Sequence, residues 1–217
     1  MTVIGSPEHW VDFIDDHIPD ILTAVIESWR QMVPPLPGAL EDHVTEALAR
    51  VLKQNRTARG LPFQIHVQST ELEPAAGEGV GRMDIAFYAP AYCEDYYFCV
   101  EAKRLNVIKD GAVRSCAWEY VRFGMMRFVT GQYAKAVRNG AMIGYVGDGR
   151  VGHAIANVEQ NIRKQHVELG MTPPGELLPS SLFPDDEHAR ETLHIRRQGR
   201  SPFRIHQLFL TGNATSN

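Results

Sequence analysis

Long apolar runs are missing from this chain of 217 residues. No segment approaches the roughly 20 consecutive apolar residues that a membrane-spanning helix requires. The first stretch, MTVIGSPEHWVDFIDD, is acidic and lacks the basic start and apolar centre of a secretion signal. We therefore expect a cytoplasmic protein that does not associate with a membrane.

Cysteine is also scarce, with three residues that show no CxxC spacing: Cys93, Cys99 and Cys116. An odd number of cysteines without that spacing indicates neither a disulfide framework nor a zinc knuckle. We expect them to be small buried side chains. The signatures of zinc proteases and α/β-hydrolases are absent too, because the sequence contains neither HExxH nor GxSxG.

Two further patterns lack the context that a functional motif needs. Residues 147–152 (GDGRVG) match GxGxxG, but a dinucleotide-binding unit also requires a second strand that ends in an acidic residue about 20 positions later. Glu168 has that spacing and lies in a helical segment, so we interpret the match as a turn. His194 and His206 lie among arginines in the expected C-terminal hairpin. For both histidines we favour a position in the core or on the surface of a strand over contact with nucleic acid.

The charge is mildly negative overall, at −4, but it is unevenly distributed. Residues 1–50 contain nine acidic residues against two arginines, whereas residues 103–138 contain eight basic residues against two acidic ones. Residues 190–205 add five arginines against Glu191. The two basic segments predict either a local phosphate-binding face or solvated helix surfaces.

Hydrophobic periodicity divides the chain into helical and extended segments. The expected helices are 7–32 with a break at Pro19, 39–54, 112–139 and 151–169. The expected strands are 62–72, 83–89, 96–105 and 141–147, followed by a hairpin over 192–210 around Gly199. This order predicts an α/β fold with a central mixed sheet flanked by helices.

We expect a single domain over residues 1–217. Its parts are an N-terminal helical extension (1–38), a core (39–170), and a C-terminal loop and β-hairpin (171–217).

The segment GRMDIAFYAPAYCEDYYFCVEAKRLN, residues 81–106, contains the most informative pattern. Asp84 lies at the start of one expected strand, and Glu101 and Lys103 lie two residues apart in the next. Because side chains alternate along a strand, Glu101 and Lys103 project from the same face. Carboxylates on adjoining strands form an oxygen site that suits Mg²⁺, and a neighbouring ammonium can steady charge on a phosphate.

Asp84 followed after sixteen residues by Glu101-Ala102-Lys103 resembles the PD-(D/E)xK nuclease superfamily, which includes many restriction endonucleases. The resemblance covers roughly residues 39–147, and Met83 stands where the superfamily often has proline. It implies a restriction-endonuclease-like αβββαβ core. It also implies that Asp84 and Glu101 bind Mg²⁺, for which Mn²⁺ can substitute, that the carbonyl of Ala102 completes the coordination, and that Lys103 assists the attacking water.

Each assignment has a structural alternative. An ExK pair on a strand is commonly a surface salt bridge, but the apolar residues YYFCV before Glu101 indicate a buried strand in which unpaired charge is costly. Glu41 shares a helical face with Val44 and Leu48, and members of the superfamily often add a catalytic, metal-binding carboxylate from this helix. Glu41 could equally be a first-turn carboxylate that the helix dipole favours.

Four residues downstream are weaker candidates for contact with nucleic acid: Arg127, Gln132, Lys135 and Arg138. Superfamily helices after the ExK strand often supply a polar residue to the site. Gln132 fits that role in part, but Ala136 stands where RecB-like nucleases have tyrosine. Ordinary helix packing or exposure is the alternative for all four.

The sequence therefore predicts a Mg²⁺-dependent nuclease that hydrolyses phosphodiesters, with DNA the favoured substrate, in restriction, phage defence or DNA repair. The chain shows no helicase or methyltransferase segment, so any sequence choice would come from a homodimer, a larger defence complex or the terminal additions. Two alternatives remain open: a catalytically silent nucleic-acid-binding subunit, and an interaction subunit that uses the acidic N-terminal helices.

Overall fold

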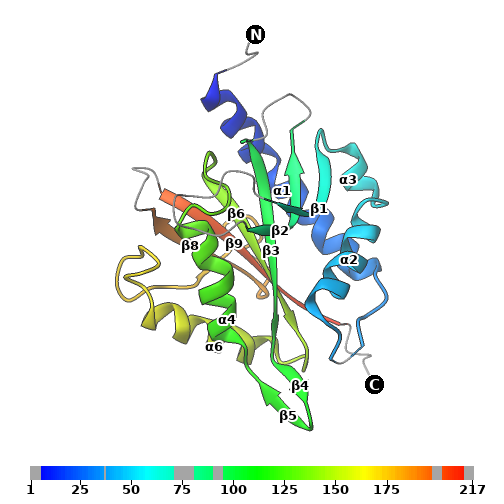
Figure 1. The fold of residues 1–217 in the computed structure, drawn as a ribbon, viewed down its shortest axis with the longest axis vertical. Helices are drawn as coiled ribbons and strands as arrows, with labels where there is room; N and C mark the ends of the chain where they lie inside the picture. The colour runs from blue at the N-terminus through cyan, green and yellow to red at the C-terminus, as the bar shows by residue number, and fades with distance from the viewer. Residues whose placement is uncertain (1–5, 37, 71–80, 90–94, 197–201, 213–217) are drawn as a thin grey trace.

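A seven-stranded mixed sheet lies between two layers of helices in the computed structural model (Figure 1). The structure describes residues 6–36, 38–70, 81–89, 95–196 and 202–212. The strands, in their spatial order across the sheet, are β1 (Gln64–Thr70), β2 (Arg82–Tyr88), β3 (Tyr97–Leu105), β6 (Asn139–Val146), β9 (Pro202–Thr211), β8 (Ala189–Ile195) and β7 (Leu178–Pro179). The expected α/β fold with a mixed sheet and flanking helices is confirmed.

The helices divide between the two faces of the sheet (Figure 1). One face carries α1 (Pro7–Gln31), α2 (Glu41–Leu52) and α3 (Arg56–Gly60). The other carries a continuous segment made of α4 (Ala117–Tyr120), the π-helical turn η1 (Val121–Met125) and α5 (Met126–Val129), together with α6 (Val151–Lys164). No helix in the described part of the chain is long and apolar enough to cross a membrane.

The centre of the sheet is parallel and its flanks are antiparallel. β3 pairs in parallel with β6, and β6 with β9, whereas β1–β2–β3 and β9–β8–β7 are antiparallel. The expected C-terminal hairpin is present as β8 and β9, although Gly199 lies outside the described residues. The hairpin is part of the main sheet, because β9 fills the position beside β6.

The predicted break at Pro19 is wrong, because α1 runs without interruption from Pro7 to Gln31. Pro19 removes one backbone donor from the helix, but its own side chain is exposed and takes no part in the core. A separate apolar stripe of α1 is buried along the helix, through Ile14, Ile18 and Ile21. Burial of that apolar stripe stabilises a helix that propensity alone would interrupt.

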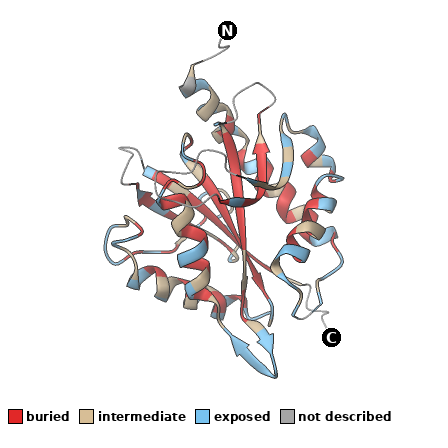
Figure 2. Cartoon of the chain, viewed as in Figure 1, coloured by how far each residue is buried: buried red, intermediate tan, exposed pale blue. Residues whose placement is uncertain are grey.

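The predicted helix over 112–139 is also wrong at both ends. Residues 112–114 form β5 (Ala112–Arg114), which pairs with β4 (Val107–Lys109) in a small hairpin that projects from the molecule (Figure 2). The helical segment stops at Val129, and Gly131 then adopts a positive φ of 84°. Gln132, Lys135 and Arg138 therefore lie in a loop before β6 instead of on a helix.

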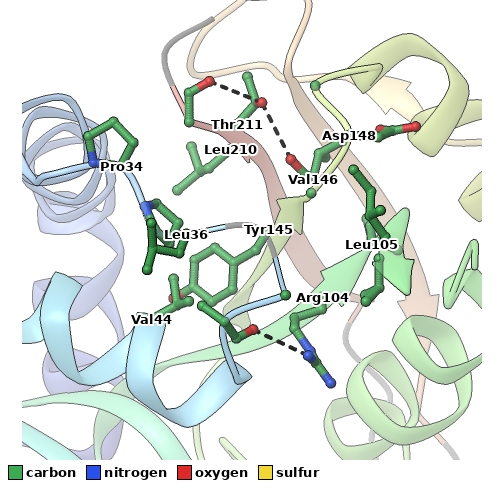
Figure 3. A pocket seen from close by; sticks show the side chains of 18 of the residues that line it. Pro34, Leu36, Val44, Arg104, Leu105, Tyr145, Val146, Asp148, Leu210 and Thr211 are labelled. Atoms are coloured by element: carbon green, nitrogen blue, oxygen red, sulfur yellow. Dashed lines mark hydrogen bonds between the residues drawn. The ribbon is translucent and has the colours of Figure 1, made fainter. Parts of the chain in front are cut away.

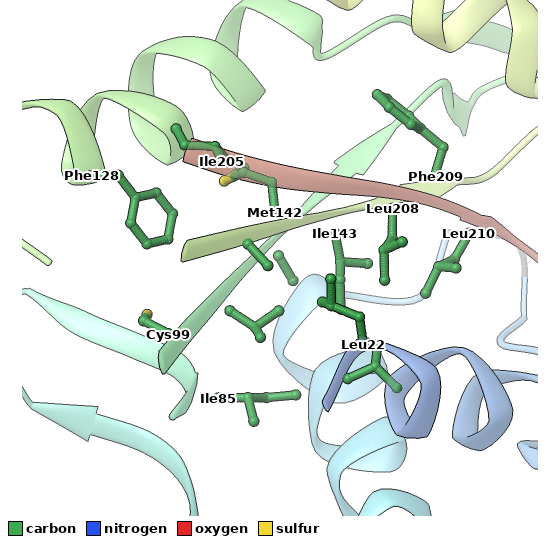
Figure 4. Close-up of a cluster of buried hydrophobic side chains, with 14 of the residues drawn as sticks. Leu22, Ile85, Cys99, Phe128, Met142, Ile143, Ile205, Leu208, Phe209 and Leu210 are labelled. Atoms are coloured by element: carbon green, nitrogen blue, oxygen red, sulfur yellow. The ribbon is translucent and has the colours of Figure 1, made fainter. Parts of the chain in front are cut away.

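Both faces of the central strands are buried (Figure 2), which explains their nearly continuous apolar sequences. In Figure 4, Ile143 of β6 points toward Leu22 of α1, whereas Met142 lies on the other side of the strand near Phe128 of α5. Residues 147–152 form the expected turn into α6, with Gly149 at a positive φ of 72°. Of the cysteines, Cys99 is buried, Cys116 is half-buried, and Cys93 lies outside the described residues.

Candidate active site

β2 and β3 separate at the acidic residues. Their antiparallel pairing runs from Tyr88–Tyr97 to Ile85–Val100, so Asp84 and Glu101 are the next residues beyond the last pair. The backbone N–H of Ala102 donates to Oδ2 of Asp84 at 2.7 Å, a bond that closes the gap between the strands. The two carboxylates therefore lie together where the backbone pairing of β2 and β3 ends. Beyond that point, backbone groups such as the N–H of Ala102 can bond side chains instead of the neighbouring strand.

Lys103 lies at the centre of the cluster. Its ammonium donates to Oε1 of Glu101 at 2.7 Å, to Oε1 of Glu41 at 2.9 Å and to the carbonyl of Ala102 at 2.7 Å. The shared contact confirms that Glu101 and Lys103 project from the same face of β3. Three of the oxygens expected to surround a metal ion thus surround the ammonium of the chain itself.

Glu41 is held by two consecutive residues of β3. Oε1 accepts from the ammonium of Lys103, and Oε2 accepts from the backbone N–H of Arg104 at 2.9 Å. Its side chain is 25% exposed, so one edge of the cluster is open to solvent. Glu41 is the first residue of α2. Its two hydrogen bonds therefore connect the first turn of that helix to β3, the strand that carries Glu101.

Glu101 has a side chain that is fully buried. Nη1 of Arg127 donates to its Oε1 at 2.6 Å and to the hydroxyl of Tyr133 at 2.9 Å. That hydroxyl in turn donates to the carbonyl of Arg82 at 2.7 Å. The chain of contacts links α5, the loop after it and the start of β2 around one carboxylate.

Burial governs the electrostatics of the cluster. It raises the pKa of Glu101 to about 8 against the opposing effect of Lys103, and it raises the pKa of Asp84. Burial alone would lower the pKa of Lys103, but Glu101, Glu41 and Asp84 outweigh that effect and raise it. The ammonium of Lys103 and the guanidinium of Arg127 therefore do not fully offset the cost of burying the ionised carboxylates of Asp84 and Glu101.

The donor set fits a divalent cation in one specific respect. Oε2 of Glu101 is buried and has no hydrogen-bond partner, a costly state for a carboxylate oxygen. A hard cation prefers such oxygen ligands. No group of three His, Cys, Asp or Glu side chains within the described ranges is arranged to hold a metal ion. The ammonium of Lys103 and the N–H of Ala102 occupy the oxygens of the predicted ligands.

The structure brings one of the four weaker candidates into the cluster, namely Arg127. Gln132 lines a groove next to Arg127, whereas Lys135 is exposed. Arg138 is turned away, since its guanidinium pairs with Asp12 at 2.5 Å and with Asp15 at 2.7 Å. This pairing disagrees with the expectation that Arg138 contacts phosphate, because two aspartates already occupy its guanidinium.

Two contributors to the cluster were not predicted. Tyr133 follows a turn whose path no periodicity indicates, and its only signal in the sequence is its position beside Gln132. Gly124 of η1 lies close to the site. A Cβ at this position would overlap the side chain of Met142 and would lie 3.5 Å from Cγ of Lys103. The absence of a side chain at Gly124 leaves room for Met142 and so lets η1 pack closely against the sheet beside the stem of Lys103.

An apolar pocket of about 330 Å³ lies next to the cluster (Figure 3). Its walls come from the segment that joins α1 to α2, including Pro34 and Leu36, and from the ends of β3 and β6, including Tyr145. Arg104 forms the shared border, since it follows Lys103 and donates from Nη1 to the carbonyl of Ala39 at 3.2 Å. None of the acidic residues of the cluster lines this pocket.

Comparison of the chain with models of protein families, with curated proteins and with solved structures finds no match.

Proposed function

We propose that the chain is a metal-dependent nuclease with a restriction-endonuclease-like core. The observation that carries the proposal is the convergence of Asp84, Glu101, Lys103 and Glu41 where β2 and β3 separate. A surface salt bridge does not account for this arrangement, because Glu101 is fully buried and one of its oxygens is unpaired. The order helix, three strands, helix, strand supports the same proposal.

In the proposed site, the carboxylates of Asp84, Glu101 and Glu41 and the carbonyl of Ala102 hold Mg²⁺ or Mn²⁺. The ion supplies Lewis-acid stabilisation of the phosphodiester and a bound water of lowered pKa. With a cation held by these oxygens, the ammonium protons of Lys103 would be available to a water or to a phosphate oxygen. Lys103 then orients the nucleophile and offsets the negative charge that develops on phosphorus-bound oxygen.

Arg127 has a positioning role in this proposal. It fixes Oε1 of Glu101 through the shorter of its two bonds and is itself held by Tyr133. With a side chain that is 32% exposed, it also presents part of its guanidinium to solvent, where a phosphate could approach.

The test is cleavage of plasmid and single-stranded DNA, and of RNA, with Mg²⁺, with Mn²⁺ and with EDTA. Asp84→Asn, Glu101→Gln and Lys103→Met should each lose at least about 100-fold in rate, because each removes a group that acts on the reacting atoms. Asp12→Asn, a change of an exposed acidic residue on α1, is the matched control and should cut at the wild-type rate.

Equal cutting by wild type and Asp84→Asn would reject the site. Binding of nucleic acid without cutting under any metal would instead favour the catalytically silent subunit. Cutting of RNA alone would retain the chemistry and change the substrate from DNA.

A further inference from the structure

We infer that a groove on the outer surface of η1 and α5 binds unpaired nucleotides next to the scissile phosphate, so that the substrate is single-stranded nucleic acid or a strand with unpaired bases. This inference rests on the proposed function. The groove has a volume of about 290 Å³, and its lining residues are Arg122, Phe123, Met126, Arg127, Thr130 and Gln132. Most of them recur at helical spacing, which places them on one face of the helical segment.

The groove is continuous with the catalytic cluster. Arg127 is common to both, since it lines the groove and donates to Glu101 at 2.6 Å. Gly124, the residue after Phe123, lies against the stem of Lys103. A strand whose phosphate reaches Lys103 can therefore place a neighbouring nucleotide in the groove.

The aromatic side chains at the groove are exposed instead of buried. Phe123 and Trp118 are each 50% exposed, and their rings meet edge to face at a centroid distance of 5.1 Å. The two residues lie on η1 and α4, and π-helical turns are frequent at functional sites. Since burial elsewhere removes most large apolar side chains from water, an exposed aromatic pair beside a cationic groove indicates a surface on which bases stack.

The charge of the groove matches a phosphate backbone. Arg122 is exposed and forms no ion pair with any residue that the structure describes, unlike Arg138 with its two aspartates. Arg127, which also lines the groove, is partly exposed. Two cations beside an exposed aromatic ring suit a strand that presents alternating phosphates and base faces. Paired bases in a duplex keep their faces covered, so stacking on Phe123 selects for unpaired nucleotides.

The experiment measures binding by the full chain in EDTA, so that no cleavage is needed. The probes are a short mixed-sequence single strand and the same sequence as a duplex. Trp118 supplies the signal, because a base stacked beside it quenches its fluorescence, and Trp118→Phe identifies its share among the three tryptophans. The wild type should bind the single strand more tightly than the duplex and show quenching with the single strand only.

Phe123→Ala should weaken single-strand binding about tenfold, within the 5- to 150-fold range expected for one stacked base. Phe123→Leu should be nearly as weak, because it keeps an apolar side chain without a ring, and Phe123→Tyr should restore binding. Val167→Ala is the control, since Val167 is 74% exposed but lies beyond α6 away from the groove.

Arg122→Ala should weaken binding and reduce the dependence of log affinity on log salt by about 0.7. Arg56→Ala removes an exposed arginine on α3 and should leave that dependence unchanged. Tighter binding of the duplex, or equal binding by Phe123→Ala and wild type, would overturn the inference even if metal-dependent cleavage is observed. Absence of cleavage with intact, Phe123-dependent binding would reject the proposed function and leave the groove standing.

Discussion

Glu101 and Arg127 share a hydrogen bond of 2.6 Å that joins a fully buried carboxylate on β3 to a partly exposed guanidinium on α5. The same Nη1 contacts the hydroxyl of Tyr133. One side chain thus connects a strand, a helix and the loop that follows the helix.

Replacing Arg127 by methionine should lower the free energy of unfolding by about 2 kcal/mol, because Glu101 loses a charged donor in a buried setting. Arg138→Met is the control, since it breaks exposed pairs and should cost less than about 1 kcal/mol. Urea denaturation measures both. An equal cost for the two variants would show that the Glu101 contact does not differ from a surface pair.

Divalent metal should stabilise the chain independently of any substrate. At a Mg²⁺ or Mn²⁺ concentration about 100 times the Kd, the melting temperature should rise by roughly 5 to 10 °C over EDTA at matched ionic strength. Asp84→Asn should abolish the shift and Asp12→Asn should retain it. A shift that persists in Asp84→Asn would place the ion elsewhere.

Gly124→Ala tests how closely η1 must pack against the sheet. A methyl group there overlaps the buried side chain of Met142 on β6, so the variant should lose about 1 to 3 kcal/mol of stability, whereas the stem of Lys103 stays at ordinary contact distance. Gly152→Ala on α6 meets nothing within 4 Å and should gain up to about 1 kcal/mol. Thermal unfolding separates the two, and a stabilised Gly124→Ala would refute the close packing.

Acid should destabilise the chain through a buried histidine. Nδ1 of His194 donates to the carbonyl of Leu169, and its Nε2 accepts from the hydroxyl of Thr192, which also accepts from Gln207. Burial lowers the pKa of His194 to about 4, and His206, also buried, follows the same direction. The unfolded chain, in which histidine has a pKa near 6.5, therefore binds the proton first.

Stability should consequently be independent of His194 above about pH 7 and fall as the pH drops from about 6.5 toward 4, by up to about 3 kcal/mol for this residue. Urea titrations across that range measure the slope. His194→Gln should reduce it, and an unchanged slope would assign the acid sensitivity to other groups.

Local periodicity predicted the parts of the site that lie on one strand. Glu101 and Lys103 share a face because the strand repeat is two residues, and no distant contact is needed to know it. For Glu41, the family resemblance indicates a carboxylate on the first core helix, and the helical repeat selects the residue that shares a face with Val44 and Leu48. The second partner of Glu41, the backbone of Arg104, depends on how α2 packs against β3 and has no sequence signal.

The errors came where packing overrides local preference. Pro19 remains helical because an apolar stripe of α1 is buried before and after it. The helical segment ends before the turn at Gly131: Arg127 lies on α5 ahead of that turn and pairs with Glu101, whereas Arg138 lies in the loop beyond it and pairs with Asp15. Arg127, Lys135 and Arg138 therefore look alike as candidates in the sequence, but they occupy different surroundings in the fold.

The residues of the cluster are also synthesised in an order that separates two groups. During synthesis, Glu41, Asp84, Glu101 and Lys103 all emerge before Arg127 and Tyr133, which complete the contacts around Glu101. Until α4, η1 and α5 cover that face of β3, water can solvate the carboxylate of Glu101, and the burial that raises its pKa does not yet exist. The electrostatic character of the site is therefore a property of the complete fold, because it requires the second helical layer to cover Glu101.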